Sequence, residues 1–168
     1  MKHTCARTTM ILVLAVGIAA GAEAGETNAF EDAMSHYEAI RIALLNDSTD
    51  GVDEHARGME ERIATLAEEL TYEKAGVPES VLAEFDELLP ELATAVGEVA
   101  EAGDLEQARE ALFALSKPLG RYRKLAGTDG TVVAYCPMAQ KAWIQPEGEL
   151  GNPYMGQAMP HCGRVIEE

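Results

Sequence analysis

Four apolar stripes, each with steps of three and four residues, occupy the chain between residues 28 and 125. This spacing places the apolar side chains of each segment on one face of an α-helix. The polar breaks between the segments are short, so successive helices are expected to lie side by side and to bury their stripes against one another. The sequence therefore predicts an all-α fold, an antiparallel four-helix bundle over residues 25–126. We place its helices near residues 28–46, 50–74, 80–102 and 104–125.

Capping signals mark the starts of the first and the last of these helices. Asn28 precedes the first stripe with Glu31 three residues later, and Asp104 precedes the fourth stripe with Gln107 at the same interval. A side chain of this type can accept a backbone N–H bond that the first turn of a helix leaves open. Pro90 lies within the third stripe, where its ring either kinks the helix or marks the first turn of a shorter one.

Residues 1–24 have the pattern of a secretory signal peptide rather than of folded structure. A basic start is followed by an apolar run from Met10 to Ala20 and by the small residues of Ala22-Glu23-Ala24. The run is too short for a comfortable membrane span, and no second apolar stretch of about 18 residues follows it. We therefore expect cleavage near Ala24, export to the periplasm and no membrane association after cleavage.

The excess of acidic residues excludes some classes of binding partner. The chain has 13 Lys and Arg against 29 Asp and Glu, a net charge of −16. Such a charge repels phosphate backbones, which excludes nucleic acid as a partner, and it modestly raises the local concentration of cations. Paired carboxylates are abundant, but in so acidic a chain they are typical of a solvated surface. The sequence contains no phosphate-binding glycine loop, Cys-x-x-Cys redox pair or nucleophile elbow, so we expect no enzyme.

After Lys124 the sequence changes character. A turn cluster, Gly127-Thr128-Asp129-Gly130, is followed by a short strand pattern over residues 131–135, and glycine and proline then recur too often for another long helix. We expect residues 127–168 to form an irregular appendage that folds back across the bundle within the same domain. Irregular backbone of this length is uncommon unless a function or a cross-link holds it in place.

Soft metal-binding side chains gather in this appendage. Two thiols, three thioethers and an imidazole occur within it: Cys136, Met138, Met155, Met159, His161 and Cys162. Thiolates and thioethers suit Cu(I), whereas calcium and magnesium require oxygen ligands, and zinc seldom uses methionine. The pattern predicts a Cu(I) site in which the cysteines dominate the affinity, because a thiolate neutralises charge and a thioether does not.

The spacing of these residues indicates how two clusters could close on one ion. An extended Cys136-Pro137-Met138 segment would direct both sulfurs to the same side. Met159 and Cys162 are three residues apart and converge only if the chain turns, which Pro160 favours. The two clusters would then act as a clasp that draws the end of the chain against the segment after Tyr135.

A series of short motifs runs through the last third of the chain: Phe113-Ala114-Leu115-Ser116, Cys136 to Ala139, Trp143, Asn152 to Gly156, Met159 and Cys162-Gly163. In these steps the sequence resembles a periplasmic domain of uncharacterised function that occurs alone and also fused to, or encoded near, adaptors of heavy-metal efflux systems. The pattern of that family is Phe-x-x-Leu-Ser, Cys-Pro-Met-Ala, a Trp, Asn-Pro-Tyr-x-Gly, a Met and a closing Cys-Gly. The first step is a near match, and the specific motifs begin only at Phe113.

The resemblance implies copper or related metal handling in the bacterial periplasm. It carries over four ligands, Cys136, Met138, Met159 and Cys162. Met155 and His161 occupy positions at which the family varies, so they are candidates on chemical grounds alone. A periplasmic copper-binding protein of this kind would sequester copper, confer resistance or deliver the ion to efflux, with an efflux adaptor or a copper chaperone as its protein partner.

Each candidate residue also has an interpretation without metal. Cys136 and Cys162 could form a disulfide, the default in an oxidising compartment, which would leave a disulfide-stapled acidic helical interaction module. The methionines could fill gaps under the appendage, and Trp143 is expected to anchor the appendage on the bundle. His36 and His55 lie beside stripe positions, where a structural histidine is the simpler interpretation, although either could approach a site built against the bundle.

Overall fold

The computed structural model describes residues 28–127 and 130–167. Within them, five α-helices and a three-stranded antiparallel sheet form a mixed α/β fold, so the prediction of an all-α four-helix bundle is wrong. The elements are α1 (Ala29–Leu45), α2 (Val52–Glu68), α3 (Tyr72–Ala75), the 3-10 turn η1 (Glu79–Val81), α4 (Leu82–Ala100), α5 (Leu105–Ala126), β1 (Thr131–Cys136), β2 (Lys141–Pro146), the 3-10 turn η2 (Gly156–Ala158) and β3 (Arg164–Glu167). The predicted signal peptide, residues 1–24, lies outside the described residues.

The first and last long helices begin at the predicted caps. The Asn28 side chain accepts the Glu31 N–H at 3.0 Å at the start of α1, and Asp104 accepts the Gln107 N–H at 2.9 Å at the start of α5. The Gln107 side chain in turn accepts the Gly103 N–H at 3.1 Å. These bonds satisfy donors that the helices leave open, which is why α1 and α5 start one residue after the predicted cap positions.

The second and third segments differ from the prediction. α2 ends at Glu68 rather than near residue 74, and Glu69 leaves the helical conformation with φ −143° and ψ 73°. Thr71 then accepts the Lys74 N–H and starts the separate α3. Pro90 lies in the interior of α4, so it does not mark the first turn of a shorter helix.

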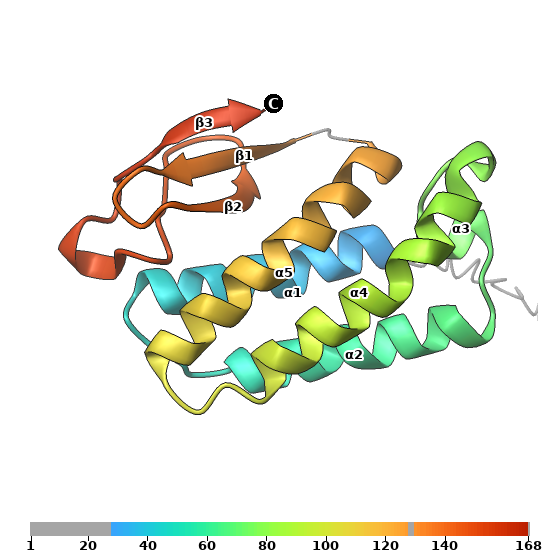
Figure 1. Ribbon diagram of the computed structural model, residues 1–168, viewed down its shortest axis with the longest axis horizontal. Helices are drawn as coiled ribbons and strands as arrows, with labels where there is room; N and C mark the ends of the chain where they lie inside the picture. Colours follow the sequence, from blue (N-terminus) through green and yellow to red (C-terminus); the bar gives the residue numbers. More distant parts are fainter. Residues whose placement is uncertain (1–27, 128–129, 168) are drawn as a thin grey trace, which may run out of the picture.

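The four long helices pack in chain order, α1 on α2, α2 on α4 and α4 on α5, and α5 also contacts α1. Figure 1 shows the sheet on the side of α1 and α5, with α2 and α4 farther from it. The helices bury large side chains such as Tyr37, Phe85 and Leu112, and the sheet adds Trp143 and Ile144 to the same core. Helices and sheet therefore share one hydrophobic core.

The C-terminal segment is more regular than predicted. β1 is the central strand in the order β2-β1-β3, and both neighbours run antiparallel to it. The strand pattern at residues 131–135 corresponds to β1, but β2 and β3 were not predicted, and the expected irregular appendage contains a sheet. In β2 three consecutive residues, 143–145, are buried, and β3 has only four residues. Neither segment shows the alternation of buried and exposed residues that identifies a strand in a sequence.

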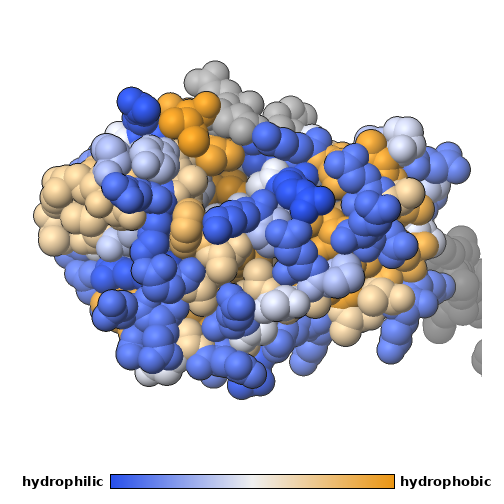
Figure 2. All heavy atoms as spheres, viewed as in Figure 1, coloured by the Kyte–Doolittle hydropathy of each residue, from blue (hydrophilic) through white to orange (hydrophobic). Residues whose placement is uncertain are grey.

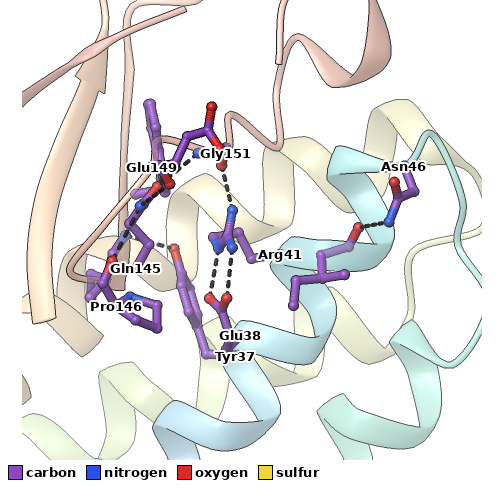
Figure 3. Close-up of polar contacts among 11 residues, drawn as sticks. Tyr37, Glu38, Arg41, Asn46, Gln145, Pro146, Glu149 and Gly151 are labelled. Carbon is purple, nitrogen blue, oxygen red and sulfur yellow. Dashed lines mark hydrogen bonds and ion pairs between the residues drawn. The ribbon is translucent and has the colours of Figure 1, made fainter. Parts of the chain in front are cut away.

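Buried polar side chains join the sheet to α1 and α5. The Tyr37 hydroxyl hydrogen-bonds the Ser116 hydroxyl at 2.7 Å and accepts the Ile144 N–H at 3.2 Å. Burial raises the pKa of Tyr37 to about 12. On the next turn of α1, Arg41 donates to the Gly151 carbonyl oxygen, as Figure 3 shows. Because buried polar groups are costly to leave unpaired, these bonds fix the position of the sheet on α1.

One face of the molecule shows how the acidic excess is distributed. Hydrophilic side chains cover much of the face seen in Figure 2, with hydrophobic atoms exposed between them. This is the distribution expected for an acidic excess, since carboxylates are costly to bury without partners. No helix in the described part of the chain combines the length and the apolar character that crossing a membrane requires.

Candidate metal centre

Strand pairing brings the two cysteines together. Cys136 is the last residue of β1, and Cys162 lies two residues before β3, which pairs with β1 through Tyr135 and Arg164. The two Sγ atoms are 3.0 Å apart. Cys136 is buried and Cys162 is partly accessible. The predicted approach of the end of the chain to the segment after Tyr135 is therefore confirmed.

A tight turn delivers Cys162 to this position. Its N–H donates to the Met159 carbonyl oxygen at 3.1 Å, which closes a turn over residues 159–162. Pro160 occupies the second position of the turn, where the fixed φ of proline is favourable. The turn that the sequence predicts for this segment is thus present.

Asn152 connects the parts of the site. Its side chain is fully buried, and its Oδ1 accepts the N–H groups of Tyr154 and Met155 at 2.8 and 3.1 Å. Its Nδ2 donates to the Cys162 carbonyl oxygen at 2.6 Å, and its backbone N–H donates to the Pro160 carbonyl oxygen at 2.7 Å. One side chain therefore caps the loop after β2 and holds the loop before β3 beside the thiols.

The surroundings of the two thiols shift their pKa values in opposite directions. Burial by itself raises the pKa of the Cys136 thiol, but hydrogen bonds from the Ala139 N–H, at 3.4 Å, and from Cys162 and Asn152 outweigh it and lower the pKa. The hydrogen bond to Cys136 raises the pKa of Cys162, and burial adds to that effect. Of the two thiols, Cys136 is therefore the one that ionises at the lower pH. A thiolate stabilised in this way is the form that binds metal or reacts as a nucleophile.

The methionines fall into two groups. Met138 lies in the turn between β1 and β2 and is 62% exposed, and Met159 is 39% exposed at the end of η2. Met155 is partly buried and packs against the core, so its position needs no metal to explain it. The expected alignment of Cys136 and Met138 along an extended chain is wrong, because the strand ends at Cys136 and residues 137–140 form a turn. The backbone N–H of Met138 nevertheless acts to lower the pKa of both thiols.

The histidines make contacts of their own. Nδ1 of His161 is 2.8 Å from the Leu150 carbonyl oxygen and 3.6 Å from the Glu149 carboxylate. A ring nitrogen bonded to a carbonyl oxygen carries a proton, so only Nε2 of His161 is left to bind a metal. His36 and His55 approach each other across α1 and α2, with their Nδ1 atoms 3.0 Å apart.

Trp143 anchors the sheet, as the sequence predicts. Its ring is fully buried, its Nε1 donates to Gln145 at 2.8 Å, and it packs edge-on against Tyr154. Gly163 crosses this ring with φ +151°, and a Cβ there would lie 2.6 Å from Trp143 Cη2. The close approach and the positive φ both require glycine, which gives the Cys162-Gly163 step a physical reason.

The distance between the two sulfur atoms is longer than in a disulfide and shorter than in a pair of thiolates that bind one metal ion. A disulfide requires about 2.05 Å, whereas two thiolates that bind one tetrahedral ion at roughly 2.3 Å are about 3.8 Å apart. From 3.0 Å, either arrangement needs only a small shift. Across residues 28–127 and 130–167, His, Cys, Asp and Glu side chains nowhere gather in groups of three or more that could hold a metal ion. A site here therefore depends on the sulfur atoms of cysteine and methionine.

Sequence reasoning missed the roles of three residues: Asn152, which holds the loop of Cys162, and Tyr37 and Ser116, which hold the sheet on the helices. Asn152 was visible only as part of an Asn-Pro-Tyr step, and nothing in its spacing indicates a bond to the Cys162 carbonyl oxygen. Ser116 and Tyr37 lie on different helices, and their hydrogen bond joins residues 79 positions apart. Such pairings depend on tertiary structure, which local patterns do not encode.

No known protein family, curated protein or solved structure matches the chain. The chemistry of the site therefore follows from its geometry alone.

Proposed function

We propose that this protein binds one Cu(I) ion through the sulfur atoms of Cys136 and Cys162, with Met138 and Met159 completing the shell. We further propose that it is exported to the periplasm, where it sequesters copper or passes it to an efflux adaptor or a chaperone. The observation that carries the proposal is a pair of thiols 3.0 Å apart whose two flanking turns each present an exposed thioether.

The exposure of the two methionines favours ligation over packing. A methionine that fills a gap in a core is buried, because burial is the source of its stabilising effect. Met138 is 62% exposed and Met159 is 39% exposed, so neither contributes in this way. A thioether at the surface, in the same turn as a thiol, is free to rotate onto a soft ion that the thiol binds.

Proton release accompanies the binding that we propose. The metal ligand is the thiolate, and the pKa of Cys162 is raised by its hydrogen bond to Cys136, so this thiol keeps its proton to the higher pH. Uptake of Cu(I) by both sulfurs displaces this proton, so the affinity rises with pH until Cys162 is ionised. The N–H of Ala139 remains beside the Cys136 sulfur and stabilises its charge.

The 3.0 Å distance between the Cys136 and Cys162 sulfur atoms also favours a second candidate function. Closure of the Cys136–Cys162 pair to a disulfide removes both thiols, and the chain is then an acidic interaction module that binds no metal. The redox state of the two cysteines in the isolated protein distinguishes the candidates.

Competition titrations with a Cu(I) chelator, under anaerobic and reducing conditions, test the ligand set. Cys136→Ser or Cys162→Ser should abolish tight binding, because a hydroxyl does not replace a thiolate as a soft ligand. Met138→Leu or Met159→Leu should weaken binding. Met155→Leu is the control, because it makes the same substitution at a methionine that packs against the core. It should leave the affinity for Cu(I) at the wild-type value.

Two results would count against this ligand set. If the chain with both cysteines replaced bound Cu(I) at wild-type strength, the site would lie elsewhere. If Met155→Leu weakened binding as much as Met159→Leu, the effect of methionine would be one of packing and not of ligation. His161→Ala should weaken binding less than replacement of Cys136, Cys162, Met138 or Met159, because its Nδ1 is already bonded to Leu150.

A further inference from the structure

A pair of histidines lies on the helical side of the molecule and has no part in the proposed copper site. His36 comes from α1 and His55 from α2, and their Nδ1 atoms are 3.0 Å apart. The ring centroids are 5.3 Å apart and the ring planes are inclined by 57°. The side chain of His36 keeps 28% of its surface exposed, so solvent and ions reach the pair.

We propose that His36 and His55 form a second metal site, for a divalent cation that prefers imidazole, with Cu(II) bound most tightly. An ion roughly 2.0–2.1 Å from each Nδ1 would subtend an N–metal–N angle of about 91–97° across the 3.0 Å separation. This is close to the right angle between neighbouring positions in tetragonal Cu(II), and it is smaller than the tetrahedral angle of zinc. Water completes the shell from the open side.

A glycine makes room for the His36 ring. Gly58 lies within α2, and a Cβ there would be 2.7 Å from His36 Cε1 and 2.8 Å from its Nε2. Glycine weakens the interior of a helix, because it loses more conformational freedom on folding than alanine does. Its presence at this position is explained by the ring that lies against it.

A carboxylate lies behind the same ring. Nε2 of His36 is 4.0 Å from Asp32, whose other oxygen is 4.0 Å from Nε of Arg62. The carboxylate lies on the Nε2 side of the ring and therefore does not compete for Nδ1, the nitrogen that faces His55. Without a metal, one Nδ1 donates to the other, and the bound cation takes the place of that single proton.

The test adds Cu(II) alone to the chain from residue 25 with Cys136→Ser and Cys162→Ser, so that no thiol binds or reduces the ion. Electron paramagnetic resonance should show one tetragonal Cu(II) per chain with two nitrogen ligands. His36→Ala or His55→Ala should weaken binding by about tenfold or more and remove one nitrogen from the spectrum. His161→Ala is the matched control and should leave the spectrum unchanged.

Two glycine substitutions distinguish loss of the metal site from general damage to the helices. Gly58→Ala keeps both imidazoles but displaces the His36 ring, so Cu(II) affinity should fall by about tenfold or more. Gly97→Ala is a helix-interior control, because its Cβ would meet only the Glu60 carboxylate, at 3.4 Å, and it should bind Cu(II) like the parent chain.

Three results would overturn the site: no Cu(II) bound, binding unchanged in both His36→Ala and His55→Ala, or binding lost in His161→Ala alone. If the serine variant does not fold, the chain with its cysteines oxidised to a disulfide gives the same readout. The Cu(I) titrations report on the cysteines, and the Cu(II) spectra report on the histidines. A negative result at one site therefore does not affect the test of the other.

Discussion

Replacing Gly163 by alanine should damage the fold and the candidate copper site together. A Cβ at Gly163 would lie 2.6 Å from Trp143 Cη2 and 3.2 Å from the Tyr135 carbonyl oxygen. Neither neighbour can move freely, because the Trp143 ring is fully buried and Tyr135 belongs to the central strand of the sheet. The backbone φ of +151° adds strain for any residue with a side chain.

Two costs add in this variant. The backbone conformation costs roughly 1–3 kcal/mol in a residue other than glycine, and overpacking against a buried ring costs about 1–3 kcal/mol. We therefore expect the free energy of unfolding to fall by roughly 2–6 kcal/mol, a large share of the roughly 5–15 kcal/mol that stabilises a typical domain. If the loop moves to relieve the clash, Cys162 separates from Cys136 and the buried thiol becomes accessible.

Urea unfolding, followed by the fluorescence of the single tryptophan of the chain, measures the first effect. The rate of reaction with a thiol reagent measures the second. Gly120→Ala is the control: a Cβ there meets no atom within 4 Å, and loss of a helix-interior glycine should raise stability by about 0.5–1 kcal/mol. If Gly163→Ala unfolded at the wild-type urea concentration and kept the wild-type thiol reactivity, the close crossing over Trp143 would be refuted.

Three further predictions concern the buried polar groups. Tyr37→Phe leaves the Ile144 N–H without its acceptor, so the free energy of unfolding, measured in urea, should fall by about 1–3 kcal/mol. The control is Tyr72→Phe, at an exposed position, which should change it by less than about 0.5 kcal/mol. Because the pKa of Tyr37 is raised from 10.0 to about 12 on folding, the unfolded chain loses this proton first, and stability should decline as pH rises from 10 toward 12; an equal decline in Tyr37→Phe would exclude Tyr37 as its source. Asn152→Ala removes the bond to the Cys162 carbonyl oxygen, so it should lower stability by about 1–3 kcal/mol and speed thiol modification; an unchanged modification rate would show that the loop is held by other contacts.

The long helices could be predicted because their signals are local. Asn28 and Asp104 cap the helices that follow them, and the apolar stripes of α1 and α5 are buried where the spacing places them. The end of α2 could not be predicted, because the stripe continues to Leu70 while the backbone breaks at Glu69. Only the cap at Thr71, which starts α3, marks the change.

The sheet could not be predicted from periodicity, because its pairing is long-range. β3 consists of four residues near the end of the chain, and only its pairing with β1 makes it a strand. The same pairing brings Cys162 to Cys136, so the expected approach of the two cysteines is confirmed even though the sheet that produces it was missed. The turn at Met159 followed from Pro160, whereas the turn at Met138 was misread as extended chain.

The most direct test of a Cu(I) site on two free thiols is a thiol count on the protein isolated without reductant, before and after one equivalent of Cu(I). We predict two titratable thiols at the start, because Cys136 and Cys162 are free and 3.0 Å apart. Both should become unreactive when the ion binds. A protein that shows no free thiol and takes up no Cu(I) would contradict the copper site, and the disulfide-stapled interaction module would then be the better description.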